Sequence, residues 1–75
     1  MNAGEQLIEQ GRERGRAEGL REAMTHVLTA RSLPLSELGR ARVASCADVA
    51  LLTLWLERAA TAASEAEVFA GADGV

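Results

Sequence analysis

The chain has 75 residues, a formal net charge of −3 and 48% hydrophobic residues, of which few are aromatic. A chain of this length forms at most one domain and buries only about 60% of the surface that it exposes when unfolded. The negative charge balance argues against a protein that holds nucleic acid through phosphate contacts, and against one that binds an anionic membrane surface.

Several chemistries are excluded by residue types that are missing. All eight basic residues are arginine, so a PD-(D/E)xK nuclease, a Schiff-base enzyme and a P-loop protein cannot be built from this chain. Cys46 is the only cysteine, which rules out an intrachain disulfide and leaves no sign of an oxidising compartment. We find no signal peptide, and the longest apolar run, Val49 to Leu56, is too short to span a bilayer. We therefore expect a cytoplasmic protein.

Residues 4 to 19 form a segment in which glycine recurs with four-residue phasing, while glutamate and arginine fill most other positions. The glycines are Gly4, Gly11, Gly15 and Gly19. Each glycine inside a helix costs about 1 kcal/mol relative to alanine, and the charged pairs four residues apart are partly attractive and partly repulsive. We therefore predict that residues 1–19 are a partly ordered helical connector. The alternative is a smooth glycine stripe that lets another helix approach closely.

From Leu20 onward the pattern is that of an amphipathic helix. Its apolar face is formed by Leu20, Met24, Val27 and Leu28. This spacing is typical of a helix packed on a core. Arg31 in the last turn favours the helix dipole. Because the residue before Pro34 is held in an extended conformation, the helix should stop near Ser32.

Polar caps predict where the next two helices begin. Ser36 is a plausible N-cap for a short helix that runs to about Ser45, and Asp48 is one for a third helix over residues 49–62. The apolar spacing of the short helix comes from Leu38, Ala41 or Arg42, and Val43.

A capping box, S-x-x-E, covers residues 64–67 and predicts a last short helix. This helix carries Val68 and Phe69, and Gly71 ends it. Residues 71–75 are expected to be a disordered tail.

Together these elements predict an all-α fold, a three-to-four-helix bundle with a long N-terminal helix and an association domain over residues 20–70. The apolar arc of the third helix spans about 220° at 100° per residue, which is wider than a surface helix needs. We therefore expect another copy of the chain to complete the bundle, giving a dimer or larger homo-oligomer. The residues predicted to form the core or the self-association surface are Leu51, Leu54, Trp55, Leu28, Val27 and Phe69. Trp55 is interpreted first as a core residue and second as an interface anchor.

Few residues suggest catalysis or metal binding. His26 and Cys46 are two soft ligands where a zinc site needs three or four, and His26 is interpreted as a surface or boundary residue. The serines at predicted helix ends are interpreted as caps rather than nucleophiles; they are Ser36, Ser45 and Ser64. We therefore predict no catalytic, metal or cofactor site, and a protein that is not an enzyme.

The arginines of the first segment suggest a different function, a nucleic-acid-binding accessory module. They are Arg12, Arg14, Arg16 and Arg21. The same segment carries more acidic than basic side chains: Glu5, Glu9, Glu13, Glu18 and Glu22. A basic footprint is therefore not formed, and the Arg12–Arg21 segment stays an alternative.

Three stretches carry a resemblance to a known family: GRERGRAEG, VLTARSLPLS and ADVALLTLWLERAATAASEAEVF, which together cover about Gly11 to Phe69. They resemble the C-terminal helical domain of Rpn-type (recombination-promoting nuclease, transposase-related) proteins. In such proteins a nuclease domain precedes glycine-charge repeats and a compact helical domain, so no catalytic residue falls on this chain. The resemblance implies a domain that joins protomers or contacts the nuclease domain, and whose short form could restrain a longer nuclease relative.

The function predicted from the sequence is therefore a non-catalytic helical oligomerisation or regulatory module. Its expected partners are further copies of the chain and a longer nuclease relative, without a membrane and without a cofactor.

Overall fold

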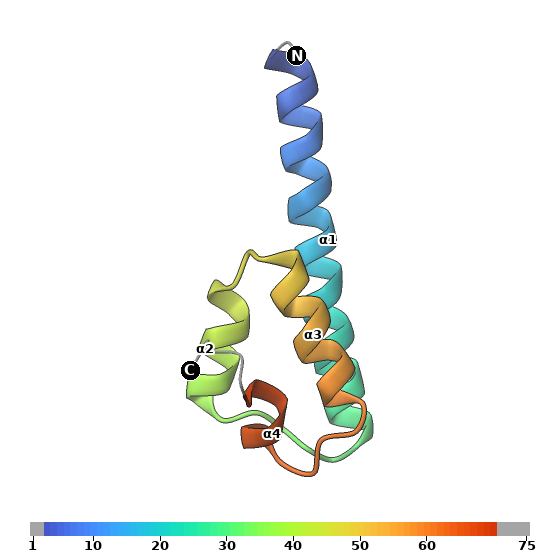
Figure 1. Ribbon diagram of the computed structural model, residues 1–75, viewed down its shortest axis with the longest axis vertical. Helices are drawn as coiled ribbons and strands as arrows, with labels where there is room; N and C mark the ends of the chain where they lie inside the picture. Colours follow the sequence, from blue (N-terminus) through green and yellow to red (C-terminus); the bar gives the residue numbers. More distant parts are fainter. Residues whose placement is uncertain (1–2, 71–75) are drawn as a thin grey trace.

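The computed structural model describes residues 3–70, and in that part of the chain it contains helices and no strand (Figure 1). The four helices there are α1 (Ala3–Ala30), α2 (Glu37–Ser45), α3 (Val49–Ala59) and α4 (Glu65–Phe69). The predicted all-α fold with a long N-terminal helix is confirmed. The predicted stop at Gly71 and the predicted tail at residues 71–75 lie outside the described residues.

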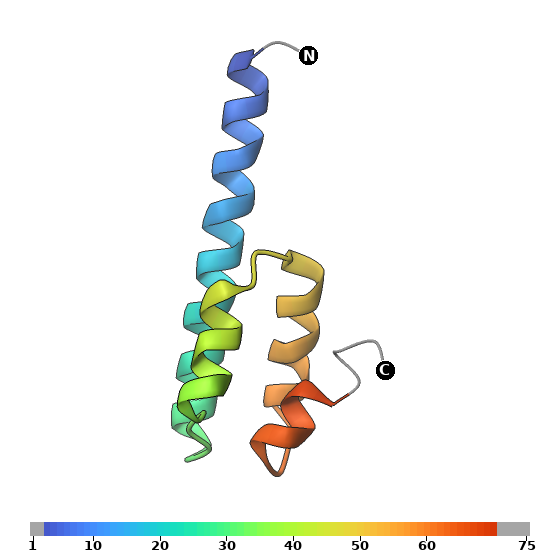
Figure 2. The ribbon, with the colours of Figure 1, turned by 90° about the vertical axis from the view of Figure 1, so that its left-hand side faces the viewer.

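α1 sets the shape of the molecule. It has 28 residues, which at 1.5 Å per residue is about 42 Å, and the molecule measures 46 × 29 × 20 Å. Its second half packs against α3, whereas its first half projects beyond the other helices (Figures 1 and 2). Among the side chains that the structure describes, Ala17 is the first buried one, and those before it are exposed.

The glycine-rich segment is part of this continuous helix, with its glycines in regular helical conformation. No atom lies within 4 Å of the position that a Cβ would occupy on Gly11, Gly15 or Gly19. The face that they form is therefore open, and whether another helix covers it stays a prediction.

α1 ends at Ala30 in a Schellman motif, in which two amides beyond the helix bond back to its last turn. Ser32 donates to the carbonyl of Thr29 (3.0 Å), and Leu33 donates to that of Leu28 (2.9 Å). Ser32 has a φ of 55°, the left-handed region in which glycine is the usual residue. The stop lies close to the predicted one, and backbone hydrogen bonds contribute to it.

The role predicted for Arg31 is wrong, because Arg31 lies beyond the last turn of α1. Its Nη1 donates to the carbonyls of Ala59 (2.7 Å) and Ala62 (2.6 Å). Since the chain has already left the helix, this side chain can cross to the neighbouring helix. Arg31 therefore satisfies carbonyls at the C-terminal end of α3 instead of favouring the dipole of α1.

The predicted caps of α2 and α3 are confirmed. Ser36 Oγ accepts a hydrogen bond from the amide of Gly39 (3.2 Å), and Asp48 Oδ1 accepts one from the amide of Leu51 (3.2 Å). Each cap satisfies an amide in the first turn that has no partner within its helix.

The inward face predicted for α2 is partly wrong. Val43 is buried, but the second inward position is Gly39, and Leu38 is 85% exposed. Gly39 and Val43 are four residues apart and share a face, which turns Leu38 about 100° away from it. In so short a helix, apolar residues one turn apart are compatible with more than one inward-facing side.

α3 ends at Ala59, earlier than the predicted Ala62. The amide of Ala60 bonds to the carbonyl of Glu57 (3.3 Å), three residues back, so the last turn tightens instead of continuing as α-helix. The carbonyl of Ala59 is then taken by Arg31. A bond from outside the helix thus satisfies a carbonyl at this boundary.

α4 begins at the predicted capping box. Ser64 Oγ accepts from the amide of Glu67 (3.4 Å), as expected. The carboxylate of Glu67 accepts from the amide of Ala63, the residue before the cap, and not from that of Ser64. The return bond of the box is therefore shifted by one residue.

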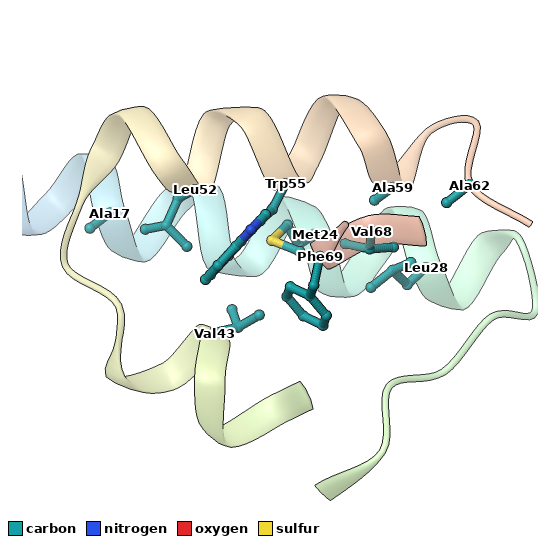
Figure 3. Close-up of a cluster of buried hydrophobic side chains, with 10 residues drawn as sticks. All are labelled: Ala17, Met24, Leu28, Val43, Leu52, Trp55, Ala59, Ala62, Val68 and Phe69. Carbon is teal, nitrogen blue, oxygen red and sulfur yellow. The ribbon is translucent and has the colours of Figure 1, made fainter. Parts of the chain in front are cut away.

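The core lies between α1, α3 and α4, with one contribution from α2 (Figure 3). Its buried residues are Ala17, Met24, Leu28, Val43, Leu52, Trp55, Ala59, Ala62, Val68 and Phe69. Trp55 and Phe69 make an edge-to-face contact, with ring centroids 4.9 Å apart and planes at 89°. The short helix α4 thus joins the core through its last two residues, Val68 and Phe69.

Candidate functional site

The six residues predicted for the core or the self-association surface divide into two groups. Leu28 and Trp55 are each 3% exposed and Phe69 is 8% exposed, so these three lie in the core. Val27 and Leu51 are partly buried, while Leu54 is 37% exposed. A surface on α3 therefore has to be built from Leu51 and Leu54 rather than from Trp55.

One edge of α3 combines apolar and charged side chains. Leu51, Leu54 and Arg58 have the spacing i, i+3 and i+7, which places them along one side of a helix. We call these three residues the α3 edge. Leu51 is partly buried, Leu54 is exposed, and the Nη1 of Arg58 is buried without a hydrogen-bond partner in the described part of the chain.

A cavity of about 330 Å³ lies where the α3 edge meets α4. Its lining residues are Arg58, Thr61, Ala62, Glu67 and Ala70. Glu67 already accepts from the amide of Ala63. The cavity is therefore lined by the partly buried Arg58, whose Nη1 is shielded from solvent, and by the exposed Thr61.

A second cavity, of about 300 Å³, lies where α1 emerges from the bundle. It is lined by Gln10, Glu13, Arg14, Ala17, Glu18, Arg21 and Ala47. Arg21 is engaged within the molecule, because its Nε and Nη2 donate to the carbonyl of Cys46 at 3.2 and 2.8 Å. Acidic and basic side chains share this lining, so it does not form a strip of free positive charge.

α2 and α4 are joined by a carboxylate. Glu65 Oε1 accepts from the amide of Ser36 (2.5 Å), and its Oε2 accepts from the hydroxyl of Ser36 (2.7 Å). These bonds lower the pKa of Glu65, the backbone bond most and the hydroxyl bond next; Arg42 lowers it further, and desolvation opposes them. Ionised Glu65 thus holds the start of α2.

Phe69 continues this connection into the core. The guanidinium of Arg42 lies over its ring at 4.9 Å, and Trp55 contacts the same ring edge-to-face. A cation over an aromatic face is attracted by the ring quadrupole. α4 therefore links α2 to α3.

The caps Ser36 and Ser64 were predicted from the sequence, whereas the hydrogen bonds between Glu65 and Ser36 were not. The partners are 29 residues apart, and no local pattern reports a contact across that separation. The available signal was Gly39, a glycine in the first turn of a short helix.

The residues weighed for metal chemistry lie at separate places. His26 is exposed on α1, and Cys46 is partly buried, with its Sγ 3.7 Å from the carbonyl oxygen of Asp48. In residues 3–70, no three histidine, cysteine, aspartate or glutamate side chains are grouped as a metal site would require. None of the helices described there combines the length and apolarity needed to cross a membrane.

The chain matches no known protein family, no curated protein and no solved structure. The resemblance to Rpn-type proteins accordingly stays a prediction that rests on the three stretches of sequence.

Proposed function

We propose that this chain is a non-catalytic association module that binds a second copy of itself through the α3 edge. The observation that carries this proposal is Leu54, which is 37% exposed on a helix whose neighbouring Leu51 is also incompletely buried. Burial of apolar surface contributes about 25 cal/mol per Å². A second copy placed on this edge would remove both leucines from water.

The end of the edge supports the same proposal. Arginine is enriched at protein interfaces, where its planar group can bond to a carboxylate on the partner. Arg58 lies one turn from Leu54 and has a buried nitrogen without a partner within residues 3–70. An apolar strip that ends in an unpaired arginine is suited to an interface.

The size of the domain gives a reason for association. Small domains bury a small share of their surface, so they often need a further source of stability. Cys46 is a free thiol, and no group in the described residues is arranged to hold a metal ion. Self-association is a source of stability that the α3 edge can provide.

Two further parts of the proposal depend on the sequence more than on the geometry. A longer nuclease relative as an additional partner rests on the resemblance to Rpn-type proteins, and a cytoplasmic location is supported by the unpaired thiol of Cys46. The nucleic-acid alternative is less well supported, because Arg21 is engaged by Cys46 and glutamates share the Arg12–Arg21 segment. Binding to duplex DNA that weakens steeply with salt would favour it.

The proposal is tested by light scattering after size exclusion, on the wild-type chain and two matched variants. Leu54→Glu places a charge on the α3 edge, whereas Leu38→Glu places the same charge on α2, where the leucine is 85% exposed. We expect a dimer or larger for the wild type and for Leu38→Glu, and a monomer for Leu54→Glu, with equal helical circular dichroism. Loss of association in both variants, or in neither, would contradict the assignment to α3.

A further inference from the structure

α3 carries opposite charges near its two ends. Asp48 is the N-cap and Arg58 lies in the last turn, ten residues apart, which corresponds to about 15 Å along the helix. Leu51 and Leu54 lie between them. The α3 edge therefore ends in a positive group, and the negative group of Asp48 lies just before its first residue, about a quarter turn round the helix.

Both charged groups have bonding capacity left. Asp48 Oδ1 accepts from the amide of Leu51 (3.2 Å), and within residues 3–70 no other bond to this carboxylate is found. Arg58 is partly exposed beside the cavity of about 330 Å³, and its Nη1 is buried without an acceptor within residues 3–70, so a partner would contact the rest of the guanidinium. A carboxylate is the group that best matches the planar donors of arginine.

We infer that two copies pair their α3 helices antiparallel, so that Arg58 of each copy binds Asp48 of the other. This inference rests on the proposed self-association and adds its register and its specificity. With a two-fold axis midway between Leu51 and Leu54, Leu51 of one copy lies opposite Leu54 of the other. Such an isologous contact uses the same patch on both copies and closes as a dimer.

The register follows from positions along the helix. Asp48 and Arg58 lie on opposite sides of the two-fold axis, and their distances from this axis along the helix differ by one residue, about 1.5 Å. Two helices in contact have axes about 8–10 Å apart, and a long arginine side chain spans the remaining offset. Each end of the strip therefore meets a group of opposite charge.

The same charges disfavour a parallel pair. In that arrangement Arg58 would face Arg58 and Asp48 would face Asp48, and like charges in contact are repulsive.

Two acidic groups in the same chain lie near Arg58 and could compete for it, Glu57 and Glu67. Glu67 is bonded to the amide of Ala63, and Glu57 lies on the exposed side of α3.

Charge reversal on separate samples gives the decisive experiment. Arg58→Glu and Asp48→Arg each place like charges at both ends of a homodimer, so each variant alone is expected to associate at least tenfold more weakly, about 1.4 kcal/mol. In a mixture of the two variants, one pair is native and the other is reversed but still attractive. The mixture should therefore form a heterodimer, detected by sedimentation or by native mass spectrometry.

Asp48→Arg also removes the N-cap of α3, so a variant that keeps the cap is needed as well. Asp48→Asn keeps a side chain that caps a helix well but removes the charge, so it should fold like the wild type and associate more weakly. If the wild type is a dimer and both Arg58→Glu and Asp48→Asn associate as tightly as the wild type, the Arg58–Asp48 register is overturned but self-association is not. A monomeric wild type would instead overturn the proposed function itself.

Discussion

The carboxylate of Glu65 lies against Gly39, with Oε2 2.7 Å from the position that a Cβ on this glycine would occupy. That close approach lets Glu65 bond to both the amide and the hydroxyl of Ser36. Because Ser36 also caps α2, the glycine is needed for α4 to hold the start of α2.

Gly39→Ala should push Glu65 away from Ser36. The pKa of Glu65, which the Ser36 bonds hold below its usual value, should then rise. Stability should change little, because alanine favours the helix by about 1 kcal/mol and offsets part of the lost hydrogen bonding. An NMR titration measures this pKa. Gly15→Ala, where a Cβ meets open space, is the control and should leave the pKa unchanged; an equal pKa in both variants would speak against the contact.

Glu65 also predicts how stability depends on pH. Its folded-state pKa lies below the usual 4.5, so its stabilising contribution is complete above that value and is lost as the pH falls through the folded-state pKa. Glu65→Gln should therefore be less stable than the wild type at neutral pH, and the gap should narrow under acid conditions. Urea unfolding at several pH values, with Glu57→Gln as control, gives this difference. A gap that is independent of pH would contradict the role of the ionised carboxylate.

Arg31→Ala should destabilise the fold by about 1–3 kcal/mol, because a charged donor to two carbonyls is lost. Those carbonyls belong to Ala59 and Ala62, at the end of α3. Chemical denaturation measures the loss, and Arg40→Ala on the exposed side of α2 is the matched control. Equal stability of the two variants would mean that Arg31 does not hold this end of α3.

Ser32→Gly should stabilise the chain by up to about 1 kcal/mol, since glycine adopts a positive φ without strain but gains more freedom on unfolding. The φ of Ser32 is 55°. A higher midpoint in thermal or urea unfolding is expected. Ser45→Gly, at the last residue of α2, should have the opposite sign, and a loss of stability at both positions would argue against the Schellman motif.

Trp55→Ala should cost about 3–5 kcal/mol, as is typical when a large core aromatic side chain is removed. Trp55 is 3% exposed and its ring contacts Phe69. In a domain this small the variant should unfold and lose association together. An unchanged melting curve would show that Trp55 is not central to the core.

The features that the sequence predicted well are those that neighbouring residues determine. Ser36 and Asp48 cap the helices that directly follow them, and the apolar face of Met24 and Leu28 repeats with the helical period, so local pattern was sufficient. Arg31 and Glu65 were misjudged or missed because their partners are distant groups, the carbonyl of Ala59 and the amide of Ser36. Such contacts arise only once the helices are packed.

The α3 edge was predicted only in part. The width of the apolar arc predicted apolar surface left for a partner, which stays a prediction, and it gave no order of burial among Leu51, Leu54 and Trp55. In the fold α4 covers Trp55 through Phe69, and α4 is too short for its position to follow from periodicity. Leu54 consequently remains on the surface.

Sedimentation equilibrium of the unaltered chain across the micromolar range tests self-association most directly. We expect a mass of at least twice the 7.9 kDa of one chain, which decreases towards that of a single chain on dilution. A mass of one chain at every concentration, with a fully helical and cooperatively folding protein, would contradict it.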